Sequence, residues 1–138
     1  ELSRDDGRLK KLADRLQRSK QGLNDYALAL TNAGQLDALT SVEQLRSRLD
    51  RLISRLRGSI SGYSGFFDFV QVNTDDLDDV DAHDNALIEE TEALSAQIEG
   101  LSAATRPAAE SISEILTKIA DLESKVDKRE DMLRGLES

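Results

Sequence analysis

Apolar residues follow one heptad spacing from Val42 to Leu136, with steps of three and four residues alternating along the chain. Only 38% of the whole sequence is hydrophobic, yet this series is interrupted at few places. Its polar members are Ser59, Asn73, Asp84, Thr91, Thr105 and Arg129. The spacing places the apolar side chains on one face of successive helices, so the sequence predicts long helices packed through apolar seams.

The N-terminal part of the chain has a seam of its own. Its leucines recur every seven residues, at Leu2, Leu9, Leu16, Leu23 and Leu30. Asp5 and Ser19 interrupt the alternate positions of this seam. Its phase does not join the later heptads without a skip, and Gly34 stands where a left-handed residue would end a helix. We therefore expect a break between residues 34 and 40.

Capping signals predict where the helices begin. Thr40 and Glu43 have the capping-box spacing, and Asn73 precedes a run of carboxylates that would complement the positive end of a helix dipole. Pro107 is tolerated in the first turn of a helix but not deeper inside one. The predicted helices cover residues 2–33, 41–70, 75–104 and 107–136.

These four segments have two possible arrangements. In an all-α up-and-down four-helix bundle, the chain turns near 34–40, 71–74 and 103–107. The alternative is a long antiparallel helical hairpin or coiled coil whose only sharp turn lies at residues 71–74. Ile53 and Ile60 widen the apolar stripe beyond a two-residue seam, which favours the bundle.

Opposite charges predict antiparallel pairing of the second and third helices. The expected pairs are Arg57 with Glu90, Arg55 with Glu92, and Arg48 with Glu99. Asp84 and Arg129 fall in opposite parts of the chain in the hairpin arrangement, so we do not expect them to pair. Polar residues at seam positions lower stability but can fix helix register or oligomeric state.

Composition narrows the classes of protein that the chain can belong to. There is no cysteine, which excludes disulfides and thiolate chemistry, and the net charge of −9 argues against nucleic-acid binding. No apolar run reaches the length of a membrane span. Because the chain starts at Glu1 and its seam continues to Leu136, we expect residues 1–138 to be one helical domain of a longer protein, which can itself be membrane-attached.

Acidic residues gather at the start of the predicted third helix. The weak candidates for a metal site are Asp75, Asp76, Asp78 and Asp79, whose oxygens would suit a hard cation such as Ca²⁺. Complementation of the helix dipole and solubility explain these residues without a metal, so we expect no metal and no cofactor. His83 has no convergent partner in the sequence, and we interpret it as a solvated residue.

Aromatic residues form a group beside Gly58, Gly62 and Gly65. Its members are Tyr63, Phe66, Phe67 and Phe69. Aromatic side chains usually fill a core, so packing is the first interpretation. A small-molecule pocket between helices is the second, because small residues allow a ligand to approach the backbone closely.

The predicted helix 107–136 carries a possible association seam. This seam consists of Ile112, Ile115, Ile119, Leu122 and Val126. β-Branched residues alternating with leucine or isoleucine are typical of parallel coiled-coil dimers. We therefore expect a protein partner or a homodimer through this helix.

Packing of helices through apolar seams explains most of the residue pattern, whereas catalytic constellations and cofactor-binding loops are absent from the sequence. We expect a non-enzymatic helical or coiled-coil module that mediates protein association or signal transmission. The alternative is a ligand-sensing four-helix bundle of a membrane receptor, which would use the aromatic group as its pocket.

Overall fold

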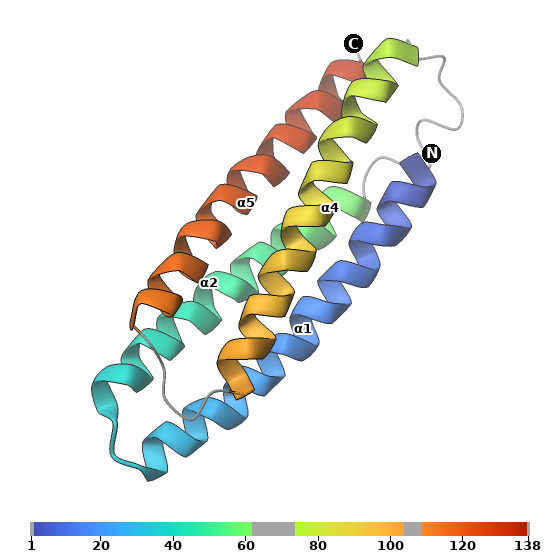
Figure 1. Cartoon of the computed structure of the whole chain (residues 1–138). Coiled ribbons are helices and arrows are strands. Elements are labelled where there is room, and N and C mark those ends of the chain that lie inside the picture. Colours follow the sequence, from blue (N-terminus) through green and yellow to red (C-terminus); the bar gives the residue numbers. More distant parts are fainter. Residues whose placement is uncertain (1, 62–73, 104–108, 138) are drawn as a thin grey trace.

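The computed structural model describes residues 2–61, 74–103 and 109–137, which form four helices (Figure 1). They are α1 (Leu2–Asn32), α2 (Leu36–Ser61), α4 (Thr74–Ala103) and α5 (Ala109–Glu137). The helices pack side by side into a four-helix bundle, which confirms the predicted fold class. The long hairpin is not formed.

The second and third helices, which were predicted to be neighbours, are not neighbours in the bundle. α1 packs against α2 and α4, and α5 packs against the same two helices. α1 and α5 therefore lie at diagonal corners, as do α2 and α4. Figure 1 shows that α1 and α4 run in one direction, while α2 and α5 run in the other.

The apolar seams of all four helices meet in one core. Heptad spacing explains this, because residues three or four apart lie on the same side of a helix. Burying each large aliphatic side chain contributes about 1.5–3 kcal/mol. Fully buried core residues include Leu9, Leu16, Leu23, Leu45, Leu49, Leu52, Leu87, Leu94, Ile98 and Ile119.

The turn between α1 and α2 is closed by Gly34. Its φ of 74° lies in the left-handed region, as predicted for a residue that ends a helix. The amide of Gly34 donates to Thr31 O at 3.1 Å, and that of Gln35 donates to Leu30 O at 3.0 Å. This pair of bonds is the Schellman motif, which satisfies carbonyls left free at the helix end.

The predicted start of the second helix was wrong. α2 begins at Leu36, so Thr40 and Ser41 lie inside it rather than at a cap. The Thr40 hydroxyl donates to the carbonyl oxygen of Leu36 at 3.1 Å. Gly34 ends α1 so abruptly that the chain turns within a few residues and the next helix starts earlier than the capping signal indicated.

The predicted ion pairs between the second and third helices were also wrong. Arg57 pairs with Asp14 of α1 at 3.2 Å, and Arg55 with Asp127 of α5 at 3.0 Å. The reason is the diagonal placement of α2 and α4, which holds their charged faces apart. The remaining partners are Glu123 for Arg48, Lys125 for Glu90, and Arg15 for Glu99.

Candidate functional site: a buried polar layer

One arginine joins all four helices near the end of the bundle where α1 begins. Arg129 of α5 is 1% exposed, and its Nε donates to Asp84 Oδ1 of α4 at 2.7 Å. Its Nη2 donates to Asp6 Oδ1 of α1 at 2.7 Å. Its Nη1 donates to the hydroxyl and the carbonyl oxygen of Ser59 in α2, at 2.9 and 3.0 Å. We call these four residues the polar layer.

Seam positions place three members of the polar layer inside the bundle. Ser59, Asp84 and Arg129 occupy heptad positions that otherwise hold aliphatic residues. A core position aims a side chain at the facing helices, so polar groups there must find partners within the protein. The long arginine side chain reaches across the core to the diagonal helix α1, which leucine could not do.

The pKa values in the polar layer reflect a competition between burial and ion pairing. Desolvation is the largest influence on the pKa of Arg129 and would lower it, but the hydrogen bonds and charges of Asp84 and Asp6 outweigh it, so the pKa is raised. Burial raises the pKa of Asp84, although the Arg129 guanidinium opposes this shift. A buried ion pair is costly to desolvate, and this cost offsets much of the attraction between the charges.

The expectation that Asp84 and Arg129 would not pair was wrong. It followed from the hairpin, in which the two residues lie far apart. In the bundle α4 and α5 are adjacent and antiparallel. Asp84 and Arg129 lie at nearly equal distances along the sequence from residues 104–108, which link the two helices, so antiparallel packing brings them to one level.

A second acidic contact lies beside the layer. Asp5 of α1 is fully buried, and neither of its carboxylate oxygens accepts a hydrogen bond. Its neighbour on α4 is Asp81, whose Oδ1 is buried and also accepts no hydrogen bond, although Arg4 Nη2 lies 3.6 Å away. Asp5 was visible in the sequence only as an interruption of the first seam, and neither Asp5 nor Asp6 was predicted as a site residue.

The sequence-predicted metal candidates have no common site in the described part of the chain. Asp78 and Asp79 are exposed on α4, and the side chains of Asp75 and Asp76 lie outside the described residues. Among the described residues, no group of three or more His, Asp or Glu side chains is placed to hold a metal ion. The aromatic group of Tyr63, Phe66, Phe67 and Phe69 also lies outside the described residues.

The predicted association seam lies in the core of the same chain. Its members are Ile112, Ile115, Ile119, Leu122 and Val126, which are between 0% and 3% exposed. They pack with residues of the other helices in the single core cluster. A homodimer through this seam would therefore need two chains to exchange helices.

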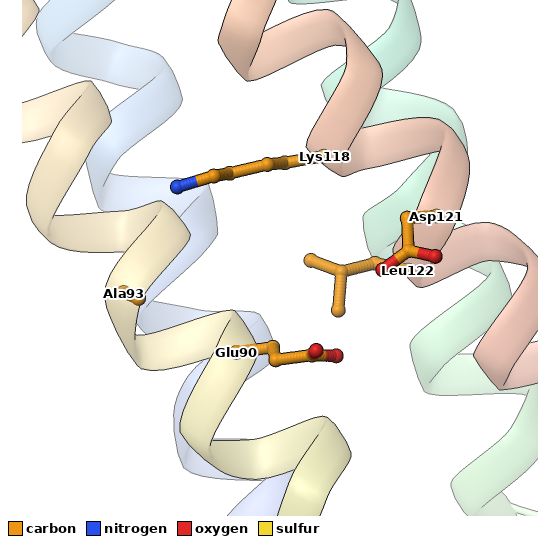
Figure 2. A pocket seen from close by; sticks show the side chains of 5 residues that line it. All are labelled: Glu90, Ala93, Lys118, Asp121 and Leu122. Carbon is orange, nitrogen blue, oxygen red and sulfur yellow. The ribbon is translucent and has the colours of Figure 1, made fainter.

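A shallow groove lies between α4 and α5 (Figure 2). Its volume is about 260 Å³, and its lining is Glu90, Ala93, Lys118, Asp121 and Leu122. The figure shows Lys118 extending from α5 toward α4, and Glu90 extending the opposite way. Lys118 donates to Gln97 Oε1 at 2.8 Å, and Lys125 pairs with both Glu90 and Asp121, so the charges are largely matched within the chain.

His83 is half-buried and not simply solvated. Its Nε2 lies 2.8 Å from the carbonyl oxygen of Lys125, so the tautomer with a proton on Nε2 donates a hydrogen bond to α5. This contact joins α4 to α5 close to the polar layer. It gives the histidine a structural partner, and nothing in the described residues adds a nucleophile to it.

No helix in residues 2–61, 74–103 and 109–137 is both long and apolar enough to cross a membrane. Comparisons of the chain with protein-family models, curated proteins and solved structures give no match.

Proposed function

We propose that this domain is a non-enzymatic helical module that transmits a conformational signal between its helices and thereby serves protein association in a longer protein. The polar layer is the observation that carries this proposal. One guanidinium bonds to Asp6, Ser59 and Asp84, which belong to three different helices.

Helix geometry explains why such a layer couples motions. A shift of one residue along a helix moves its side chains by about 1.5 Å, which exceeds the tolerance of a hydrogen bond. An axial shift of α1 would therefore break the bond from Arg129 to Asp6 or displace Arg129. Displacement of Arg129 would in turn disturb Ser59 and Asp84. A purely apolar layer tolerates sliding better because its contacts are not directional.

The proposed partner is another protein, which would contact the outward face of α5. Glu114, Asp121 and Lys128 are exposed on this helix, while its apolar seam is occupied inside the bundle. Exposed charged groups suit a regulated contact, since they guide association and select partners more than they add affinity. Homodimerisation by helix exchange is the competing outcome.

Amide hydrogen exchange of a Ser59→Ala variant tests the coupling. This change removes one bond to Arg129 from α2 alone. If the layer transmits motion, amides near Asp6 in α1 and near Asp84 in α4 should exchange faster, as well as those of α2. Ser54→Ala, at an exposed position of the same helix, is the matched control and should change only its own turn. A response to Ser59→Ala that stays within α2 would contradict the proposal.

Ligand sensing is the second candidate function, and the groove between α4 and α5 favours it. Lys118 beside Glu90 and Asp121 could hold a small zwitterionic molecule, although about 260 Å³ is slightly below the usual range of ligand pockets. A thermal-shift screen with amino acids and related metabolites is the test. A ligand at a hundredfold excess over its dissociation constant should stabilise the domain by about 2.7 kcal/mol. Loss of that shift in Lys118→Ala would favour the sensor. If no compound shifts the melting temperature, sensing of amino acids and related metabolites is excluded.

A further inference from the structure

Asp5 is a buried charged group beside the polar layer, and its environment does not match its charge. Its side chain is 0% exposed, and neither carboxylate oxygen accepts a hydrogen bond within the described structure. Arg4 Nε and Arg8 Nη1 each lie 3.9 Å from Asp5 Oδ1, which is too long for a hydrogen bond. The side chains of these arginines are 61% and 43% exposed, so water weakens their attraction.

Groups on the neighbouring helices add more negative charge. α4 contributes Asp81, whose Oδ1 is buried without a hydrogen bond and lies 3.6 Å from Arg4 Nη2, and Asp84, whose Oδ2 also has no hydrogen bond. From α5 comes Arg129, but its hydrogen bonds go to Asp84, Asp6 and Ser59. α2 contributes Ser59, whose hydroxyl accepts from Arg129. On α1 itself Asp6 is already bound to Arg129. His83 lies beside Asp84 on α4 and bonds to the Lys125 carbonyl.

Both oxygens of Asp5 and Oδ1 of Asp81 accept no hydrogen bond, whereas Asp81 Oδ2 accepts a long one of 3.5 Å from Asn85 Nδ2. Two neighbouring carboxylates can hydrogen-bond to each other only when they share a proton. If one of them carries a proton, its O–H donates to the other, and a repulsive contact becomes a strong charge-assisted hydrogen bond. No backbone amide donates to Asp5 in the described structure, and the two cations that face it, Arg4 and Arg8, stay beyond hydrogen-bond distance. A metal ion is the other partner for a buried carboxylate, and no group of described residues is arranged to hold one.

We infer that Asp5 and Asp81 form a proton-binding site, in which a single proton bridges α1 and α4 and can be taken up and released. Asp5 holds the proton and donates it to Asp81, which stays ionised. Release leaves Asp5 charged against Asp81 and Asp84, and so weakens the contact between the first turns of α1 and α4. This site does not depend on the proposed function, because proton uptake would occur whether or not the module transmits a signal.

The acid–base properties of the pair agree with this geometry. Burial raises the pKa of Asp5 to about 7, and the hydrogen bond and charge of Asp81 add to the shift. The same hydrogen bond to Asp5 lowers the pKa of Asp81. The two carboxyls thus titrate as a pair, with one proton held over a wide range of pH.

The raised pKa of Asp5 determines how the stability of the domain changes with pH. The folded protein keeps a proton on Asp5 that the unfolded chain releases above pH 3.8. Stability therefore falls as pH rises from about 4 to about 7, by up to about tenfold in the unfolding equilibrium constant per pH unit, and then levels off.

Urea unfolding between pH 5 and pH 8 tests the site, with the ¹³C shift of the Asp5 carboxyl followed in the same range. The wild type should lose stability across this interval, and the carboxyl carbon should titrate near pH 7. Asp5→Asn should remove that part of the pH dependence, because a neutral amide has no proton to lose. Asp25→Asn, at an exposed position of the same helix, should behave as the wild type.

Two further measurements keep the test decisive. Asp81→Asn supplies an amide donor to the Asp5 carboxylate, so the Asp5 titration should move to lower pH even if Asp5→Asn fails to fold. The titration is repeated in NaCl, KCl and CaCl₂ at equal ionic strength. An Asp5 carboxyl that is already ionised at pH 5, or parallel pH profiles for wild type and Asp5→Asn, would overturn the inference. A titration that depends on which cation is present would also overturn it, in favour of a metal site.

Discussion

Arg129 Nη2 donates a hydrogen bond of 2.7 Å to Asp6 Oδ1, and this bond connects α5 to α1, the helix at the diagonal corner of the bundle. Helices at diagonal corners share little packing, so a direct bond between them needs a long side chain that crosses the core. The same guanidinium binds Ser59 of α2 and Asp84 of α4, the other diagonal pair. One residue of α5 therefore forms hydrogen bonds to each of the other three helices.

Removal of Arg129 should be strongly destabilising. Arg129→Met leaves Asp84 and Asp6 without their cation, and breaking a buried ion pair from one side costs about 3–5 kcal/mol. Urea unfolding at pH 7 measures this loss. Arg134→Met is the control on the same helix: the Arg134 side chain is 63% exposed, and this variant should stay within about 1 kcal/mol of the wild type.

Replacing the ionic members together should recover most of this loss. Arg129→Met combined with Asp84→Leu and Asp6→Leu removes the unpaired charges and fills the space with apolar groups, which is often neutral or stabilising. The triple variant should unfold at a higher urea concentration than Arg129→Met alone. A triple variant less stable than the single one would mean that the layer contributes net stability.

The four helices were predictable because heptad spacing and Gly34 are local signals. Which helices are neighbours could not be predicted, because an apolar seam does not specify which corner of the bundle a helix occupies. Residues 62–73 link α2 to α4, and these two helices lie at diagonal corners. Charge matching between the second and third helices therefore selected wrong pairs. Asp84 and Arg129 carried a usable signal, namely two opposite charges at seam positions on either side of the turn predicted at residues 103–107.

Two glycine substitutions should act in opposite directions. Gly34→Ala places a side chain at a φ of 74° and should destabilise the domain by about 1 kcal/mol, although the added Cβ has open space around it. Gly100 is exposed inside α4, and Gly100→Ala should stabilise by about 0.5–1 kcal/mol through helix propensity. Thermal unfolding of both variants checks this pair. Equal effects of the same sign would show that Gly34 is not needed for the turn.

Core leucines and surface leucines should differ sharply. Leu49 is 0% exposed, and Leu49→Ala should cost about 2–5 kcal/mol through lost burial and the cavity left behind. Leu28 is 61% exposed, and Leu28→Ala should change the free energy of unfolding by no more than about 0.5 kcal/mol. Denaturant titration distinguishes them. A large loss on changing Leu28 would indicate that another chain covers this residue.

The isolated domain should be a monomer, because the seam from Ile112 to Val126 is filled by its own helices. Sedimentation equilibrium at micromolar concentration is the measurement, and it should return a mass near 15.2 kDa. A stable dimer in which α5 cross-links to α4 of another chain would instead show helix exchange. That outcome would support the homodimer over a separate protein partner.

A double-mutant cycle between Ser59→Ala and Asp6→Asn tests the central claim that Arg129 couples the helices. The two residues lie on α2 and α1, and they have Arg129 as a common hydrogen-bond partner. The unfolding free energies should be non-additive by about 0.5 kcal/mol or more, since each change alters the bonds left to the other. The same cycle with Ser54→Ala should be additive. Additivity of Ser59→Ala with Asp6→Asn within experimental error would contradict the account.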